Sequence, residues 1–221
     1  MRRRLSWLVT LSVPIVLTMS LVRLLTLPWY PAWEYGRAGF PEDPYGLSQE
    51  DRLRLAHASI RFLNIAGPTT VLADLELPDG TPAHNERELD HMDDVKRVYS
   101  GLTLAAAGCL VASGVSAWQL ARSGDGCAVW QALIRGAALT LVLLAALGSW
   151  MLLAFDRFFT LFHDVFFQPG TWTFYHSDTL IRLFPFRFWE DAGLLVAGGV
   201  TLVTLALLVV SVAMRRRCLA R

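Results

Sequence analysis

The sequence predicts an all-α polytopic membrane protein, with four transmembrane helices and an outer-face subdomain between the first and second of them. The first observation behind this prediction is hydropathy. Of the 221 residues, 54% are hydrophobic and only 18% are charged, and the mean hydropathy is +0.41. The apolar residues gather in uncharged blocks long enough to cross about 30 Å of hydrocarbon as helices. We place the spans at residues 5–27, 99–121, 133–155 and 192–214, within a single membrane domain, 1–221.

The second observation is the distribution of charge along the chain. Nine of the 20 Lys and Arg residues, but one of the 19 acidic residues, lie at the two ends of the chain or in and beside the short loop between the second and third spans. Because basic residues are retained on the cytoplasmic side, we expect a multi-pass protein of the cell membrane with its N- and C-termini cytoplasmic. Residues 28–98 and 156–191 then lie outside. The nine basic residues are Arg2, Arg3, Arg4, Arg122, Arg135, Arg215, Arg216, Arg217 and Arg221.

A cleaved signal peptide is the alternative reading of the first span, since the chain begins with basic residues. However, the apolar run is long, and no small-x-small cleavage pattern precedes Arg23. We therefore expect an uncleaved membrane anchor.

The outer segment between the first two spans is predicted to hold two helices and a short strand. Ser48 is a typical N-cap followed by acidic residues, and a Gly-Pro pair ends this first helix. Residues 71–77 partly alternate, which favours a short strand. Asn85, with Glu88 three positions later, forms a capping-box pattern. No helix breaker follows, so we expect the second helix to run straight into the second span.

The third span is expected to continue as a helix past Phe155. On such a helix Asp156, Thr160 and His163 share one stripe. The stretch 172–189 that follows is rich in aromatic residues and is expected to form a loop in the outer headgroup layer.

Several kinds of site have no motif in this sequence. There is no G-x-G-x-x-G, no P-loop, no G-x-S-x-G elbow and no H-E-x-x-H helix, and no basic patch on the outer side suggests nucleic-acid binding. The three cysteines contain no C-x-x-C pair, and we interpret them as small residues tolerated in a membrane protein. His84 and His91 do not match a standard metal-ligand spacing. We therefore expect no cofactor and no metal.

The candidate functional residues are ionisable groups near the outer ends of the second and third spans. Such groups are costly at membrane depth and often functional. Histidine titrates near neutral pH and is a poor membrane anchor, so His91 and His163 are the predicted catalytic residues. Lys96 and Arg97 are typical interfacial anchors, and Asp156 and Arg157 fit either role. The remaining histidines, read as surface residues or left undecided, are His57, His84 and His176.

Both histidines lie in segments that resemble a known family, the bacterial lipoprotein intramolecular transacylases. The first segment carries an asparagine-glutamate-arginine-glutamate run followed by a histidine-methionine-x-aspartate-valine-lysine pattern. The second is followed by a tryptophan and a further apolar motif, and the similarity covers nearly the whole chain in order. The matching residues are Asn85-Glu86-Arg87-Glu88, His91-Met92-Asp93-Asp94-Val95-Lys96, Phe162-His163-Asp164-Val165-Phe166-Phe167, Trp172, Leu180-Ile181-Arg182-Leu183-Phe184-Pro185 and Tyr45-Gly46-Leu47-Ser48.

The resemblance implies a reaction and a substrate. The substrate is a diacylated lipoprotein in the membrane, whose N-terminal cysteine carries a diacylglyceryl thioether and a free α-amine. The enzyme moves the sn-2 acyl chain from the glycerol onto that amine, which gives a lyso-form lipoprotein. His91 and His163 then share the proton transfers. Arg87 is our candidate for holding the oxyanion or the glycerol oxygen, and Asp94 for orienting His91.

Composition and spans alone leave two other functions open. One is a non-catalytic membrane scaffold or carrier, in which the outer histidines tune packing or respond to pH. The other is a lipid or lipoprotein ester hydrolase, in which water takes the place of the amine. The transacylase is favoured by the resemblance, and we further expect the two histidine rings to line one cleft that opens towards the outer leaflet.

Overall fold

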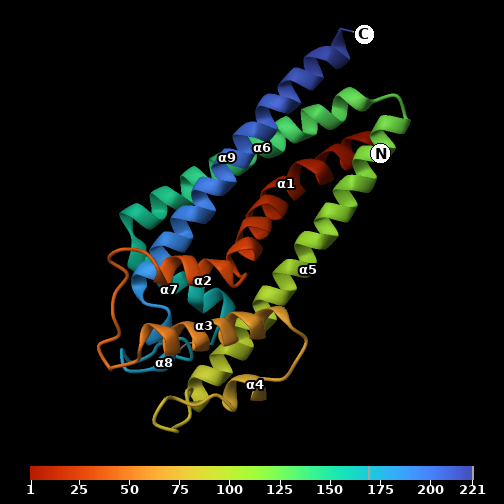
Figure 1. Cartoon of the computed structure of the whole chain (residues 1–221). Coiled ribbons are helices and arrows are strands. Elements are labelled where there is room, and N and C mark those ends of the chain that lie inside the picture. The colour runs from red at the N-terminus through yellow and green to blue at the C-terminus, as the bar shows by residue number, and fades with distance from the viewer. Residues whose placement is uncertain (169, 221) are drawn as a thin grey trace. The chain divides into compact units, whose positions relative to one another are not determined.

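The computed structural model describes residues 1–168 and 170–220. Every regular element within these residues is a helix, apart from an isolated β-bridge between Glu76 and Pro82. The helices follow one another along the chain as shown in Figure 1. They are α1 (Arg2–Leu25), α2 (Trp29–Tyr35), α3 (Gln49–Asn64), α4 (Thr70–Ala73), α5 (Glu86–Arg122), α6 (Gly126–Leu153), α7 (Phe155–Phe166), α8 (Thr179–Leu183) and α9 (Phe186–Leu219).

Four helices, α1, α5, α6 and α9, are long and apolar enough to cross a membrane, as far as the described residues go. This confirms an all-helical protein with four membrane spans. The chain divides into two compact units. The first contains residues 1–22, 102–155 and 195–221, and the second contains residues 23–101 and 156–194.

Close backbone approaches hold the helices of the first unit together. The Thr10 hydroxyl of α1 donates a hydrogen bond to the Ala132 carbonyl of α6, at 3.1 Å. Near this contact a Cβ on Gly136 would lie 2.6 Å from the Val13 side chain, so only glycine fits. A Cβ on Gly199 of α9 would lie 2.8 Å from the end of the Leu21 side chain of α1. Small residues at helix contacts are the usual means by which membrane helices approach closely.

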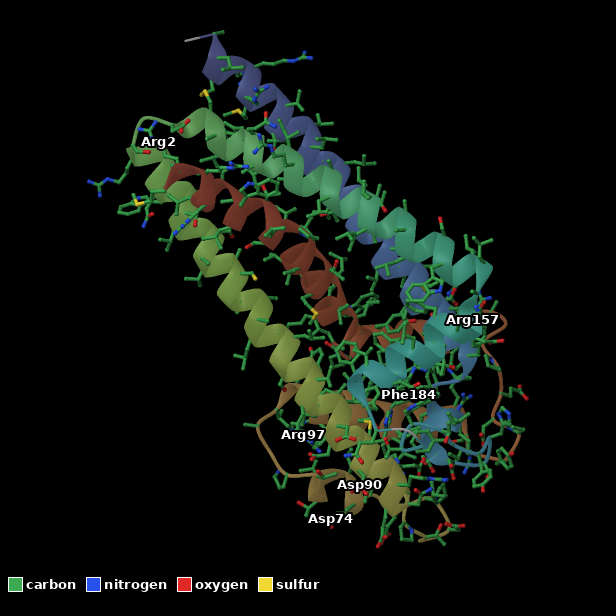
Figure 2. The ribbon with its side chains drawn as sticks, turned by 180° about the vertical axis from the view of Figure 1, so that it is seen from behind. Arg2, Asp74, Asp90, Arg97, Arg157 and Phe184 are labelled. Atoms are coloured by element: carbon green, nitrogen blue, oxygen red, sulfur yellow. A yellow bond between two sulfur atoms is a disulfide. The ribbon has the colours of Figure 1, made fainter. Side chains whose placement is uncertain are left out.

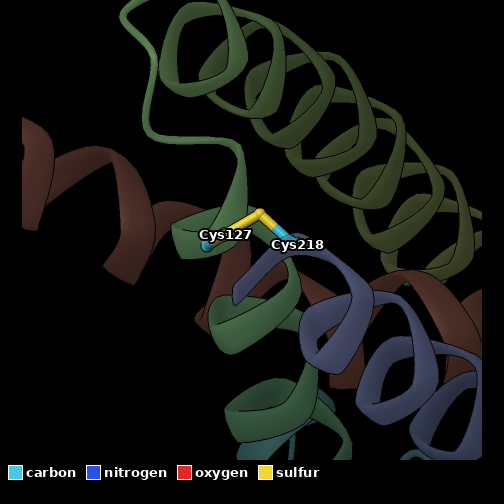
Figure 3. The surroundings of a disulfide bond; sticks show 2 residues. All are labelled: Cys127 and Cys218. Carbon is cyan, nitrogen blue, oxygen red and sulfur yellow. A yellow bond between two sulfur atoms is a disulfide. The ribbon is translucent and has the colours of Figure 1, made fainter. Parts of the chain in front are cut away.

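A disulfide joins Cys127, in the first turn of α6, to Cys218, in the last turn of α9 (Figure 3). This corrects our interpretation of these two cysteines as merely small residues. Their separation of 91 residues explains the error, because a spacing rule detects only pairs that are close in sequence. Cys109 is free.

The core of the second unit forms between α3, α4, α8 and the start of α5. Leu55 and Leu183 are fully buried in one cluster, and Phe62, Leu72 and Met92 are buried in another. Ser48 caps α3, accepting the Asp51 backbone N–H as expected, and α3 ends at Asn64, ahead of the Gly-Pro pair.

Three local expectations need correction. Residues 71–77 do not form a strand: they contain most of α4, because Leu72 is fully buried in the core and no neighbouring strand in the described part of the chain is available to pair with. The third span does not continue unbroken past Phe155, since Ala154, at φ −153° and ψ 55°, separates α6 from α7. The stretch 172–189 is not simply a loop, because it contains α8 and the first turn of α9.

Candidate active site

The first candidate residue, His91, is placed by the start of α5. The Asn85 side chain accepts the Glu88 backbone N–H at 3.0 Å, and Glu88 accepts the Asn85 N–H at 2.9 Å. This reciprocal pair is the expected capping box. No break follows it within α5, which runs for 37 residues as one helix. His91 therefore lies in the polar second turn of α5, ahead of the apolar stretch that can span a membrane.

The capping residues also bind the segment that precedes α8. The second carboxylate oxygen of Glu88 accepts the Leu180 backbone N–H at 2.7 Å, and Glu88 is almost fully buried. Asp178 accepts hydrogen bonds from the Asn85 amide and the Arg87 guanidinium, and also from the Tyr175 backbone N–H. The start of α5 and residues 174–180 are thus held together by carboxylates with several partners each.

The second candidate residue, His163, lies on α7. Its Nδ1 is 2.7 Å from the Phe159 carbonyl oxygen, one turn earlier on the same helix. A carbonyl only accepts hydrogen bonds, so Nδ1 carries the hydrogen and Nε2 keeps its lone pair. The helix therefore selects the tautomer in which Nε2 is the basic nitrogen.

Phe167 brings the two histidines into one cluster. Its ring centroid is 5.0 Å from that of His91 and 5.7 Å from that of His163. Phe174 lies 5.2 Å from His91, and Trp172 lies 4.7 Å from His163. We call the rings around the two histidines the aromatic cluster; its members are Phe159, Phe162, Phe167, Trp172 and Phe174.

Burial in this cluster keeps both imidazoles neutral. It lowers the pKa of His91 to about 4, with a further decrease from the neighbouring His163 and a partial offset from Asp94. The pKa of His163 is also lowered by burial, against opposing effects of the Phe159 carbonyl and of Asp164. At neutral pH each ring can therefore accept a proton. The Nδ1 atom of His91 is buried and has no hydrogen-bond partner among the described residues.

The other candidate residues are placed differently from the histidines. Asp94 forms an ion pair with Arg97 at 2.6 Å, and Arg87 forms one with Asp178 at 3.1 Å. Figure 2 shows Arg97 on α5 and Arg157 on α7. The side chains of Asp156 and Arg157 are exposed.

Asp94 and Arg97 line a groove next to the aromatic cluster. Its volume is about 390 Å³, and Phe167, which contacts both histidines, forms part of its wall. The remaining lining residues are Val165, Phe166 and Gln168. Among the residues that the structure describes, no group of three or more His, Cys, Asp or Glu side chains is arranged to hold a metal ion.

Two features of this unit were missed from the sequence. His84 is not a surface residue: it is 5% exposed, because the chain just before α5 packs into the core beside Ala83. The indole nitrogen of Trp172 is buried and has no hydrogen-bond partner within the described ranges. Only the position of Trp172, soon after the second histidine segment, distinguished it in the sequence.

Comparisons with known proteins agree with this fold. A protein of Aquifex aeolicus, itself uncharacterised, is 32% identical over 197 residues, which cover 89% of this chain and 88% of that protein. The crystallised lipoprotein intramolecular transacylase of Bacillus cereus has the same fold, with a TM-score of 0.75 at 19% identity over 100% of this chain and 96% of that one. A variant of that enzyme with a histidine replaced by arginine gives a TM-score of 0.70 at 17% identity, over 100% and 92% of the two chains.

The family profile described as "Lipoprotein intramolecular transacylase Lit" matches residues 6–189, which include both histidine segments and the aromatic cluster. This match extends over most of the chain, and the chain therefore belongs to the lipoprotein intramolecular transacylase (Lit) family.

Proposed function

We propose that this protein transfers the sn-2 acyl chain of an S-diacylglyceryl lipoprotein onto the α-amine of the same N-terminal cysteine. The family gives the class of reaction, an intramolecular transacylation of a lipoprotein. The observation that supports the finer assignment is that His91 and His163 both contact the ring of Phe167. Two neutral imidazoles in one aromatic cluster suit a reaction that must take protons from a nitrogen and give one to an oxygen.

The reaction balances without a co-reactant. The α-ammonium loses one proton to become an amine, whose nitrogen forms a bond to the sn-2 ester carbon as the carbonyl electron pair moves onto oxygen. The nitrogen then loses a second proton, the oxyanion collapses, and the bond from carbon to the glycerol oxygen breaks. One proton goes to the glycerol oxygen and one to solvent, and the products are an N-acyl cysteine and a free sn-2 hydroxyl.

We assign His163 as the base that takes the proton from the attacking nitrogen. Its Nδ1 hydrogen is committed to the Phe159 carbonyl, which leaves the lone pair of Nε2 to accept. His91, which is neutral at rest, is assigned to accept that proton from His163 and pass it to the glycerol oxygen as this oxygen leaves. With a pKa of about 4, protonated His91 is a strong enough acid to give that proton up readily.

The apolar surroundings favour transfer over hydrolysis. The aromatic cluster places hydrocarbon rings against both histidines, and we propose that a bound substrate completes this apolar surface and displaces water from the ester. Donor and acceptor belong to one molecule, so holding it folded supplies an effective molarity of about 10⁵ M or more. A serine or cysteine nucleophile is therefore not required.

We further propose that this chemistry takes place at the outer face of the cell membrane. The charge distribution puts residues 28–98 and 156–191, which hold both histidines, on the side opposite the basic termini. The substrate's acyl chains stay in the bilayer, because each buried CH₂ contributes about 0.8 kcal/mol to membrane binding. The partners are thus the diacylated lipoprotein and the surrounding membrane lipids.

The test uses the purified protein in lipid with a synthetic diacylglyceryl-cysteine lipopeptide. Mass spectrometry should show a product of unchanged mass whose fragments carry one acyl chain on nitrogen. His91→Ala and His163→Ala should each lower its rate of formation by at least about 10²-fold, the contribution of a lost general acid or base. The exposed His176 provides the matched control, His176→Ala.

Each alternative gives a different outcome in the same assay. A hydrolase would lower the mass of the lipopeptide by one acyl chain, and a scaffold would leave both mass and fragments unchanged. If the two histidine variants retain the rate of His176→Ala, the assignment of the pair is wrong.

A further inference from the structure

Trp172 holds a hydrogen-bond donor that no described residue accepts. Its indole nitrogen is buried, yet it has no partner among the described residues. The large majority of buried polar side-chain atoms in folded proteins are hydrogen-bonded, because a buried donor without an acceptor destabilises the fold. A donor left without a partner inside a reactive cluster is explained if its acceptor arrives with the substrate.

The position of this donor is tied to the assigned base. The Trp172 and His163 ring centroids are 4.7 Å apart with the planes tilted by 35°, and Phe159 packs against the Trp172 ring at 5.8 Å. The ring that carries this donor is thus packed directly against the ring of the assigned base. Tryptophan offers a donor and no acceptor, so the only group it can satisfy is an oxygen or another lone pair.

Arg87, the charged candidate for the same role, is already engaged. Its guanidinium donates to Asp178 at 3.1 Å and lies over the rings of Phe174 and Tyr175. Asp94 pairs with Arg97. Within the described part of the site, Trp172 is therefore the free side-chain donor adjacent to a histidine.

We propose that the indole N–H of Trp172 donates a hydrogen bond to the acyl carbonyl oxygen as that oxygen becomes the oxyanion, which makes Trp172 a catalytic residue. This proposal rests on the proposed function. The bond from nitrogen to carbon forms, the carbonyl electron pair moves onto oxygen, and the N–H of Trp172 stabilises the negative charge without giving up its proton. The pair returns to carbon when the bond to the glycerol oxygen breaks. A donor preorganised in apolar surroundings has its greatest effect on a charge that exists only in the transition state.

The experiment compares Trp172→Phe with Trp189→Phe in lipid, using the diacylglyceryl-cysteine lipopeptide. Trp172→Phe keeps an aromatic ring and removes the donor, so kcat should fall about 10²-fold while KM stays within about threefold, as for a lost oxyanion donor. Trp189 is exposed and its N–H donates to the Phe184 carbonyl, so Trp189→Phe removes an indole donor elsewhere in the unit and should leave kcat unchanged.

Replacing the indole nitrogen of Trp172 by sulfur, with a benzothienyl-alanine at this position, separates the donor from ring packing. This side chain preserves the shape of the indole and its packing against His163, so the variant should show the same loss of kcat as Trp172→Phe. The pH profile of kcat should keep its shape, because the donor does not titrate, whereas a role in positioning His163 would shift it.

Unchanged kcat in Trp172→Phe, or full activity with benzothienyl-alanine, would overturn the proposal. A shifted pH profile with the rate restored at another pH would do so too. Failure of the proposed function is seen separately, because the wild-type protein would then form no N-acyl product.

Discussion

The stability of the second unit should depend on pH because the ring of His84 is buried, and a substitution at His84 should remove this contribution. His84 is 5% exposed, both ring nitrogens are buried without a partner among the described residues, and burial lowers its pKa to about 4. In the unfolded chain the ring is in water, where its pKa is about 6.5. Between these two values the unfolded state binds a proton that the folded state does not, so stability falls as the pH falls below about 6.5.

The size of the effect follows from the two pKa values. From about pH 7.5 to about pH 5.0, His84 should lower the free energy of unfolding by about 2 kcal/mol. For a chain of this size that corresponds to a decrease in Tm of roughly 4–8 °C. His84→Leu removes the titrating ring and keeps an apolar side chain of similar volume. The decrease in Tm between the two pH values should therefore be roughly 4–8 °C smaller for the variant than for the wild type.

The assay is thermal unfolding in detergent, followed by tryptophan fluorescence at both pH values. His91 and His163 are present in both proteins, so their own pH dependence cancels in the comparison. His176→Leu is the control, because this ring is already exposed in the folded protein. If His84→Leu and the wild type lose the same Tm on acidification, the protonation of a buried His84 is not what destabilises the fold.

Three further predictions concern other parts of the molecule. Glu88 accepts the backbone N–H groups of both Asn85 and Leu180, and Glu88→Gln keeps only one acceptor oxygen for the two. The variant should therefore destabilise the second unit by about 1–2 kcal/mol in thermal unfolding. An unchanged Tm would contradict this role of the Glu88 carboxylate. With the native cysteines replaced, a cysteine at Asp79 should react with a membrane-impermeant thiol reagent in intact cells and one at Ser123 should not; the opposite pattern would reverse the topology. Cys127→Ser should lower the stability of the protein by about 2–4 kcal/mol relative to the oxidised wild type, seen as a lower Tm without reductant. The Tm of the variant should match that of the reduced wild type.

Features encoded by neighbouring residues were predictable from the sequence. The caps at Ser48 and Asn85 depend on residues three positions apart, and both are present. The four spans follow from uncharged runs whose length is set by the bilayer. His91 and His163 were selected as candidates because each lies next to such a run and histidine is a poor membrane anchor, and their catalytic role stays a prediction.

Features that depend on distant segments were not predictable in this way. The burial of His84 and the pairing of Cys127 with Cys218 depend on packing between parts of the chain that no local pattern links. The unsatisfied nitrogen of Trp172 is a property of three-dimensional surroundings, not of sequence. The break at Ala154 has no local signal, because neither a glycine nor a proline lies there and alanine is the strongest helix former. The fold therefore imposes this interruption of the helix.

The disulfide divides the polypeptide into a closed ring and an open arm. Every residue from Cys127 to Cys218 belongs to the ring, which includes His163, whereas His91 lies on the N-terminal arm. A single protease cut within the ring leaves the chain in one covalent piece until the disulfide is reduced, and a cut in the arm releases a fragment at once. Non-reducing gels after limited proteolysis therefore tell on which side of this boundary a cut has fallen, and only a cut between His91 and Cys127 separates His91 from the piece that holds His163.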